Sequence, residues 1–355
     1  MRVSRIVIFC TMFVFTVLRC FYFDWYRPLE RWDEATNISV INETIRHTSI
    51  AVLWKNNKPF FEKPPFWYSA GSFLTLTTPL SQVISLRLFS ALSGTLIICV
   101  VCLFAYKTWG ILAGITSWAV LISTNHLFVS NIPDVFSTHT FQSADGDALF
   151  LLFIVCSGFL SLGLRHSRRA AIGSGIFTGF AVITKSPLGF IPLIVETFLM
   201  FTSKNNKNSS KNVMLAWFVT LLIFFCWFIP MCILFTYEFV HEYVAYHVVK
   251  RAIIPIEQHS ESLWFYVELL FSKRVFLFME IYIISAITIL RSNRLFKDRT
   301  LLFVWYCSIC FLLIPTLIQT KLSWYIFPFY PFAALTISGA LSHYLNFSRF
   351  SDNRV

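Results

Sequence analysis

The stretch VISLRLFSALSGTLIICVVCLFAY (83–106) decides the fold class of this chain, because it is mainly apolar over its whole length. A helix needs about 20 such residues to cross a bilayer. A second run, GILAGITSWAVLISTNHLFV (110–129), follows after a short break. Over its 355 residues the chain is 56% hydrophobic and only 13% charged, whereas soluble domains carry about 25% charged residues. The composition therefore excludes a soluble globule and predicts an integral membrane protein.

The same pattern recurs along the chain and predicts an all-α fold, a polytopic transmembrane helix bundle with about ten spans. Pro187 and Gly189 separate two of these spans, and Lys185 lies beside the break. Backbone groups freed at such a break must be satisfied within protein or in a wet cavity. The expected spans are 6–23, 83–106, 110–129, 147–164, 170–184, 187–202, 213–236, 275–290, 300–318 and 323–345.

The segment PPFWYSAGSFLTLTTP (64–79) is apolar but too short to cross, and we expect it to lie flat on the outer face. Charge supports this choice. If 64–79 does not cross the membrane, basic clusters such as 165–169 fall on the cytoplasmic side. The acidic residues on that side are then Asp298 and Asp352. Cytoplasmic loops carry an excess of Lys and Arg. The sequence therefore predicts that both termini are cytoplasmic.

The predicted organisation is one domain over residues 1–345, with two long outer segments at 24–82 and 237–274. Interfacial helices are expected in the first of these segments. A short cytoplasmic tail at 346–355 follows, and no soluble carboxy-terminal domain is expected. The formal net charge is +11, but the basic residues are scattered between apolar spans. This is the pattern of membrane orientation signals and not of a nucleic-acid partner.

Ionisable residues from five separate loops are predicted to fall on the outer side. Several lie directly against spans, where a charge usually pairs with another or lines a wet cavity. A mixed group of acids and bases at the membrane surface suits a substrate that is partly lipid and partly anion. The residues are Asp33, Glu34, Glu62, Lys63, Asp145, Asp147, Lys185, Arg251, Glu257, His259 and Lys321.

Each of these residues also has an ordinary structural explanation. Acids at the start of a helix cap it or offset its macrodipole, adjacent opposite charges form local ion pairs, and lysines at span ends snorkel to the interface. Helix capping applies to Asp33, Glu34, Asp145 and Asp147. A local ion pair applies to Glu62 with Lys63, and snorkelling applies to Lys185 and Lys321. The gathering of all of them on one side favours a functional site.

Two early segments, WDEATNISVINETI (32–45) and NNKPFFEKPPFWYSAGSFL (56–74), resemble the amino-terminal signature of the GT-C glycosyltransferases. That signature is an acidic pair opening an outer helix, then a Glu-Lys-Pro-Pro turn before an amphipathic helix. The nearest group in this superfamily is the protein-mannosyltransferase and lipid A aminoarabinose-transferase group, of the glycosyltransferase family 39 type.

Four later segments resemble further motifs of the same superfamily and occur in the same order. In the second and third of them, Ser186 and Gln258 replace the glycines usual in the family. The segments are QSADGDALFLLF (142–153), FAVITKSPLGFIPL (180–193), VVKRAIIPIEQHSESLWFY (248–266) and TKLSWYIFPFYPFAAL (320–335).

The resemblance implies transfer of a sugar from a polyprenyl-phosphate donor to a lipid, protein or glycan acceptor, with inversion, on the periplasmic side of a bacterial inner membrane. It implies that Asp33 is the catalytic base, with Glu34 as the alternative. A carboxylate can take the proton of an attacking hydroxyl. The departing phosphate needs positive charge, which Lys63, Arg251, Lys321 and Lys185 are predicted to supply.

Supporting or substrate-binding roles are predicted for the residues Glu62, Asp145, Asp147, Glu257 and Tyr325. A divalent metal ion stays open as a cofactor, with Glu62 and His259 as its ligands, because carboxylate and imidazole are competent donors. Two other function classes also stay open: a transporter or flippase of lipid-linked sugars, and a polytopic assembly protein without catalysis. Charges gathered at one face, without a visible repeat, count against a transporter.

Overall fold

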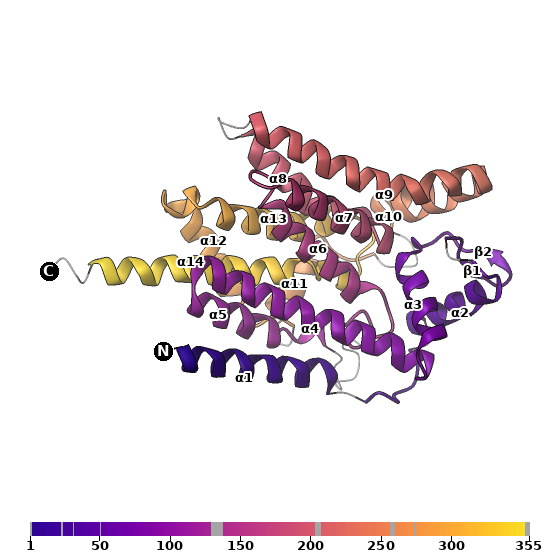
Figure 1. The fold of residues 1–355 in the computed structure, drawn as a ribbon, viewed down its shortest axis with the longest axis horizontal. Helices are drawn as coiled ribbons and strands as arrows, with labels where there is room; N and C mark the ends of the chain where they lie inside the picture. Colours follow the sequence, from indigo (N-terminus) through magenta and orange to yellow (C-terminus); the bar gives the residue numbers. More distant parts are fainter. Residues whose placement is uncertain are drawn as a thin grey trace.

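The computed structural model is a bundle of helices that run along the long axis of the molecule (Figure 1). It describes residues 2–22, 24–30, 32–49, 51–128, 138–202, 207–255, 260–272 and 275–351. The main helices are α1 (Arg2–Phe21), α2 (Asp33–Arg46), α3 (Phe66–Thr77), α4 (Gln82–Trp109), α5 (Ile111–Ile122), α6 (Asp147–Ser161), α7 (Arg168–Thr184), α8 (Ile191–Phe201), α9 (Lys207–Phe239), α10 (Arg251–Ile253), α11 (Phe265–Phe271), α12 (Met279–Arg291), α13 (Arg299–Leu317) and α14 (Phe329–Ser351).

A helix lies in each of the predicted spans, and the protein is an integral membrane protein. By length and hydropathy, the segments Gln82–Trp109, Ser210–Ile253, Arg299–Leu317 and Ser323–Leu345 are able to cross a bilayer. Shorter apolar helices occupy Ile111–Ile122, Asp147–Ser161 and Pro187–Phe201. The all-α bundle is therefore confirmed, while the number of about ten crossings stays a prediction.

Helix α9 folds back on itself, so that helices continue into the predicted outer segment 237–274. At Thr236 the backbone has φ 37° and ψ −105°, which no helix adopts. After this reversal a π-helix, η3 (Val240–Lys250), packs along α9. The ring centroid of Trp227 consequently lies 5.6 Å from that of Phe239 and 5.3 Å from that of Tyr243.

The predicted outer segment 24–82 forms a cap of α2, α3 and a small hairpin at one end of the bundle (Figure 1, right). The hairpin pairs β1 (Trp54–Lys55) with β2 (Lys58–Pro59), an element absent from the all-α prediction. Its turn residues Asn56 and Asn57 both have positive φ, as a type I′ turn requires. Helix α3, the predicted interfacial helix, has 12 residues and a length of about 18 Å, too short for a bilayer core.

The two chain ends lie at the other end of the bundle. Helix α1 begins there and α14 ends there (Figure 1, left), opposite α2, α3 and the hairpin. This agrees with the expectation that both termini share one side of the membrane. The cytoplasmic identity of that side stays a prediction.

A buried ion pair fastens the cap to the bundle. The side chains of Glu34 in α2 and Arg87 in α4 are both fully buried, and Nη2 of Arg87 lies 2.7 Å from Oε2 of Glu34. The Arg87 guanidinium also donates to the Oε1 of Glu34 and to the backbone carbonyls of Trp25, Arg27 and Pro28. Glu34 in turn accepts from the backbone N–H of Ala144, in the loop before α6. One pair thus joins three segments that are far apart in sequence.

Replacing Arg87 with Leu should strongly destabilise the protein. The change leaves the Glu34 carboxylate buried without its main cation, which costs about 3–5 kcal/mol of the free energy of unfolding. Thermal unfolding of the detergent-solubilised protein measures the loss. Arg169→Leu, at an exposed position of α7, is the matched control and should change stability by less than about 0.5 kcal/mol. Equal unfolding temperatures for both variants would contradict this role.

Candidate active site

The start of α2 leaves the carboxylate of Asp33 free for a functional role. An acid at this position ordinarily serves the helix end. Here Glu30 does so instead, because its Oε2 accepts from the backbone N–H groups of Trp32 and Asp33 at 3.0 and 2.7 Å. The Asp33 side chain therefore points away from its own helix end, toward the loop before α6.

Two cationic side chains flank the Asp33 carboxylate. Its Oδ2 lies 2.9 Å from Nε2 of His139, and its Oδ1 lies 3.5 Å from Nζ of Lys63. The side chain of Asp33 is 18% exposed, whereas that of His139 is 5% exposed. Asp33 is therefore the more accessible of the two side chains.

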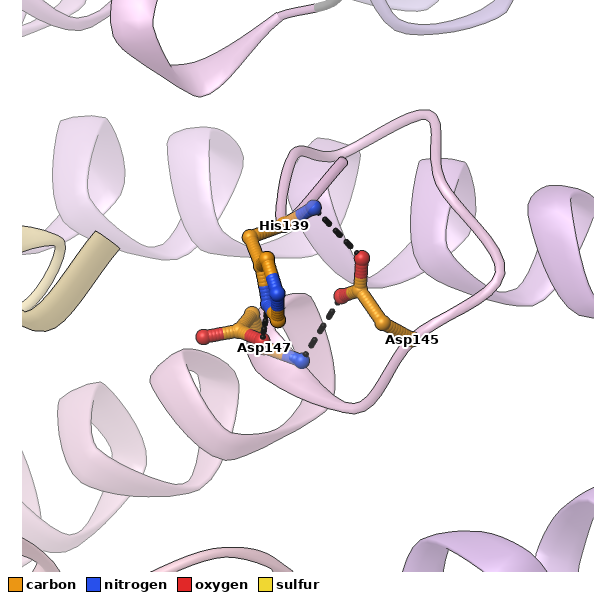
Figure 2. Close-up of side chains that lie close together, drawn as sticks. All are labelled: His139, Asp145 and Asp147. Carbon is orange, nitrogen blue, oxygen red and sulfur yellow. Dashed lines mark hydrogen bonds and ion pairs between the residues drawn. The ribbon is translucent and has the colours of Figure 1, made fainter. Parts of the chain in front are cut away.

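His139 connects Asp33 to a second carboxylate, that of Asp147. Figure 2 shows the His139 ring beside Asp147. Nδ1 of its ring lies 2.7 Å from Oδ2 of Asp147, the first residue of α6. The other oxygen of Asp147 forms an ion pair with Lys185, at the end of α7. The imidazole ring also stacks on Trp324, with 3.7 Å between centroids and 13° between planes.

Asp145 builds the loop that carries His139. Its carboxylate accepts from the backbone N–H of His139 at 2.7 Å and from that of Asp147 at 3.1 Å (Figure 2). His139 itself has φ of +55°, an uncommon conformation outside glycine. Gly94 in α4 makes room for this loop, since a Cβ there would lie 2.4 Å from the ring of Phe141. The loop is thus held rigidly against the bundle.

The charges around Asp33 fix its protonation state. Burial alone would raise the pKa of Asp33, but the hydrogen bond and charge of His139, with Lys63, hold it well below the usual range. Burial likewise opposes the charge of His139, yet Asp147 and Asp33 raise the pKa of its imidazole to about 9. The pKa of Lys63 is raised as well, against burial, by Tyr68, Asp33 and Glu62. At neutral pH the group is an anion between two cations.

The two predicted site residues Arg251 and Tyr325, from the last two motif segments, contact each other. Nη1 of Arg251 lies 3.4 Å from the hydroxyl of Tyr325, one residue after the Trp324 that stacks on His139. Backbone bonds hold the two segments together, from Gln319 N–H to the Ala252 carbonyl and from Thr320 N–H to the Arg251 carbonyl. The structure therefore brings Arg251 beside the segment whose Trp324 stacks on His139.

Two predicted functional residues have structural roles instead. Glu34, the alternative catalytic acid, is fully buried and bonded to Arg87, so it cannot meet a substrate. Lys321, predicted to bind phosphate, is 5% exposed. Its ammonium donates to the backbone carbonyls of Pro315, Thr316 and Ile318 at the end of α13. The final carbonyls of a helix have no hydrogen-bond donor within that helix, and the Lys321 ammonium acts as their donor.

The other predicted site residues have fewer described contacts with Asp33. Glu62 is half-buried beside Lys63, whose pKa its charge helps to raise. Glu257 and His259 lie outside the described residues, so the metal site predicted from Glu62 and His259 stays a prediction. Lys185, predicted to bind the donor phosphate, joins the group by forming an ion pair with the carboxylate of Asp147.

Sequence reasoning missed His139, Trp324 and Arg87. His139 carried no signal beyond its position just before the motif 142–153, and Trp324 none beyond its position within the motif 320–335. Arg87 did carry one, because a charge inside an apolar span is costly unless it is paired. A search for its partner among the acids of the outer segments would have pointed to Glu34.

One buried group among the described residues has donors suited to a metal ion. His139, Asp145 and Asp147 each offer a ligand atom, and these atoms lie within 4.8 Å of one another. The donor types suit a divalent ion. As arranged, however, both ring nitrogens of His139 face carboxylate oxygens, and Lys185 pairs with Asp147. A metal ion would have to displace these protonated groups.

Comparison with solved structures identifies the fold. The chain superimposes on ArnT from Cupriavidus metallidurans, a lipid A aminoarabinose transferase crystallised with undecaprenyl phosphate, with a TM-score of 0.77. The two are 19% identical, and the match covers 95% of this chain and 60% of that one. No protein-family model and no curated protein matches the sequence.

A second similar structure is the oligosaccharyltransferase AglB from Archaeoglobus fulgidus, in complex with an inhibitory peptide and a dolichol-phosphate. Its TM-score is 0.63 at 15% identity, over 98% of this chain and 52% of AglB. A complex of the same oligosaccharyltransferase with Zn and sulfate has a TM-score of 0.58 at 14% identity, over 96% and 49% of the two chains. The chain thus spans about half to three-fifths of these proteins, and it has the fold that they share as members of the GT-C superfamily, as the sequence resemblance predicted.

Proposed function

We propose that this protein is a membrane glycosyltransferase that moves a sugar from a polyprenyl-phosphate donor to an acceptor on the outer, periplasmic side of the membrane. The observation that carries the proposal is the pair of Asp33 and Lys63, 3.5 Å apart at one rim of a GT-C fold. A carboxylate beside an ammonium suits a reaction in which one group is deprotonated while an anion departs. The bound undecaprenyl phosphate of ArnT supports a polyprenyl carrier.

In this mechanism the acceptor hydroxyl attacks the anomeric carbon, and the bond from that carbon to the phosphate oxygen breaks. Asp33 takes the proton of the hydroxyl. Its low pKa keeps it ionised at neutral pH, and its partial exposure lets it meet the hydroxyl. A single displacement of this kind inverts the anomeric configuration.

The leaving group is a phosphate monoester, which departs without a general acid but gains from nearby positive charge. Lys63 is placed to meet it, since its side chain is 32% exposed and its charge is secured by the carboxylates around it. Arg251 is the second candidate, because a guanidinium binds phosphate in a bidentate manner. Its neighbour Tyr325 orients the guanidinium through the hydroxyl.

Replacing Asp33 with Asn should lower the transfer rate by about 100-fold or more, because the variant keeps the shape of the side chain but cannot take the proton. Transfer of radiolabelled sugar from polyprenyl-phosphate donors by the purified protein measures the rate. Glu43→Gln, in the same helix but beside the hairpin, is the control and should retain activity. Normal turnover in the Asp33 variant would remove this residue from the mechanism.

Replacing Lys63 with Ala should weaken binding of polyprenyl phosphate. A hydrogen bond to a charged group contributes about 1.5–3 kcal/mol, so the dissociation constant should rise by tenfold or more. Displacement of a fluorescent polyprenyl phosphate measures the affinity, with Lys58→Ala in the exposed hairpin as control. An unchanged affinity in the Lys63 variant would show that the phosphate binds elsewhere.

A further inference from the structure

Five side chains of alternating charge form a continuous line through the candidate active site. The line runs from Lys63 through Asp33, His139 and Asp147 to Lys185. It joins the Glu-Lys-Pro-Pro turn, α2, the loop before α6, α6 itself and the end of α7. The imidazole of His139 is the central member, and each of its two neighbours is a carboxylate.

The ring of His139 is fixed in this central position from several directions. Its two nitrogens lie 2.7 and 2.9 Å from carboxylate oxygens of Asp147 and Asp33. Both distances are those of hydrogen bonds, and neither oxygen belongs to a group that donates when ionised. Both nitrogens must therefore carry a proton, which makes the ring a cation. Trp324 covers one face of the ring at 3.7 Å, and Asp145 holds its backbone N–H.

A divalent metal ion between two carboxylates would perform the same electrostatic task. It would screen their repulsion and hold both in one orientation. In this structure the space between Asp33 and Asp147 is filled by the imidazole ring, and the remaining oxygen of Asp147 is paired with Lys185. Binding of a metal ion at His139, Asp145 and Asp147 would require removal of a ring proton and displacement of the ammonium.

We propose that protonated His139 is a positioning residue that takes the place of a divalent metal ion between Asp33 and Asp147, so that this enzyme works without a resident metal. The effect expected on the transfer rate rests on the proposed function, whereas the effect expected on metal binding rests on geometry alone. His139 does not meet the substrate. It acts through Asp33, whose carboxylate it holds at the exposed rim beside Lys63.

The proposal predicts the result of replacing the central cation with an anion. In His139→Asp the carboxylates of Asp33, Asp147 and the new side chain converge without a cation at their centre. Such a group binds hard divalent ions such as Mn²⁺ or Mg²⁺. The variant should therefore gain a metal dependence that the natural protein lacks. In His139→Gln, which offers an uncharged amide, activity should fall and no metal dependence should appear.

The first measurement is of metal content and does not depend on catalysis. Each protein is incubated with Mn²⁺ and, separately, with Zn²⁺, passed over a desalting column and analysed for bound metal. The natural protein should retain less than a tenth of an equivalent and show no shift in unfolding temperature between Mn²⁺ and EDTA. His139→Asp should retain close to one equivalent of Mn²⁺ and unfold at higher temperature with it. His166→Asp, at an exposed position between α6 and α7, should behave as the natural protein does.

The second measurement is the transfer rate in EDTA and in Mn²⁺. The natural protein should be equally active in both. His139→Asp should lose about 100-fold in EDTA and recover about tenfold or more with Mn²⁺. One equivalent of tightly held metal in the natural protein, lost together with activity on chelation, would overturn the proposal. If the natural protein transfers no sugar at all, the proposed function fails, while the metal content still decides whether His139 occupies the place of an ion.

Discussion

The buried pair of Glu34 and Arg87 is the interaction on which the outer end of this protein depends. A guanidinium inside an apolar helix must be neutralised and fully hydrogen-bonded, and Arg87 achieves this only by drawing in Glu34 and the carbonyls of Trp25, Arg27 and Pro28. Because Glu34 also binds the N–H of Ala144, the same pair brings the loop before α6 against α2. The distance between Asp33 and His139 follows from this arrangement, since each is part of one of the two segments that Glu34 connects.

The candidate site is a balance of charges as much as a set of reactive groups. Asp33 and Asp147 each lie between two cations, and this alternation keeps Asp33 ionised and Lys63 and His139 protonated in a partly buried setting. Lys63 lies on the exposed side of this group, with a side chain that is 32% exposed. The charges on the buried side, Asp147 and Lys185, fix the others in place.

The likeness to ArnT and AglB concerns the fold, and contacts between distant segments of this chain build the site within it. Helix α9 reverses at Thr236 and packs back along itself, which carries Arg251 to the segment around Tyr325. The end of α13 is completed by Lys321. Trp324 follows three residues later and stacks on His139. The contacts that end α13 therefore also position one side of the site.

The sequence by itself determined the membrane class, the positions of the helices and the gathering of ionisable residues toward one end, because these follow from hydropathy, span length and motif order. It also singled out Asp33 and Lys63 as candidate site residues, although it did not predict their contact. Only the tertiary structure decided which acid is free. Glu30 caps α2 and Arg87 neutralises Glu34, so Asp33 alone of these three acids is turned to the rim. The same holds for Lys321, which serves helix carbonyls, and for His139, which no motif marked. The hydrogen-bond partners of these side chains lie far away in the sequence, 106 residues apart for His139 and Asp33 and 110 for Ala144 and Glu34. The local sequence therefore does not show which of several similar side chains such a partner will bind.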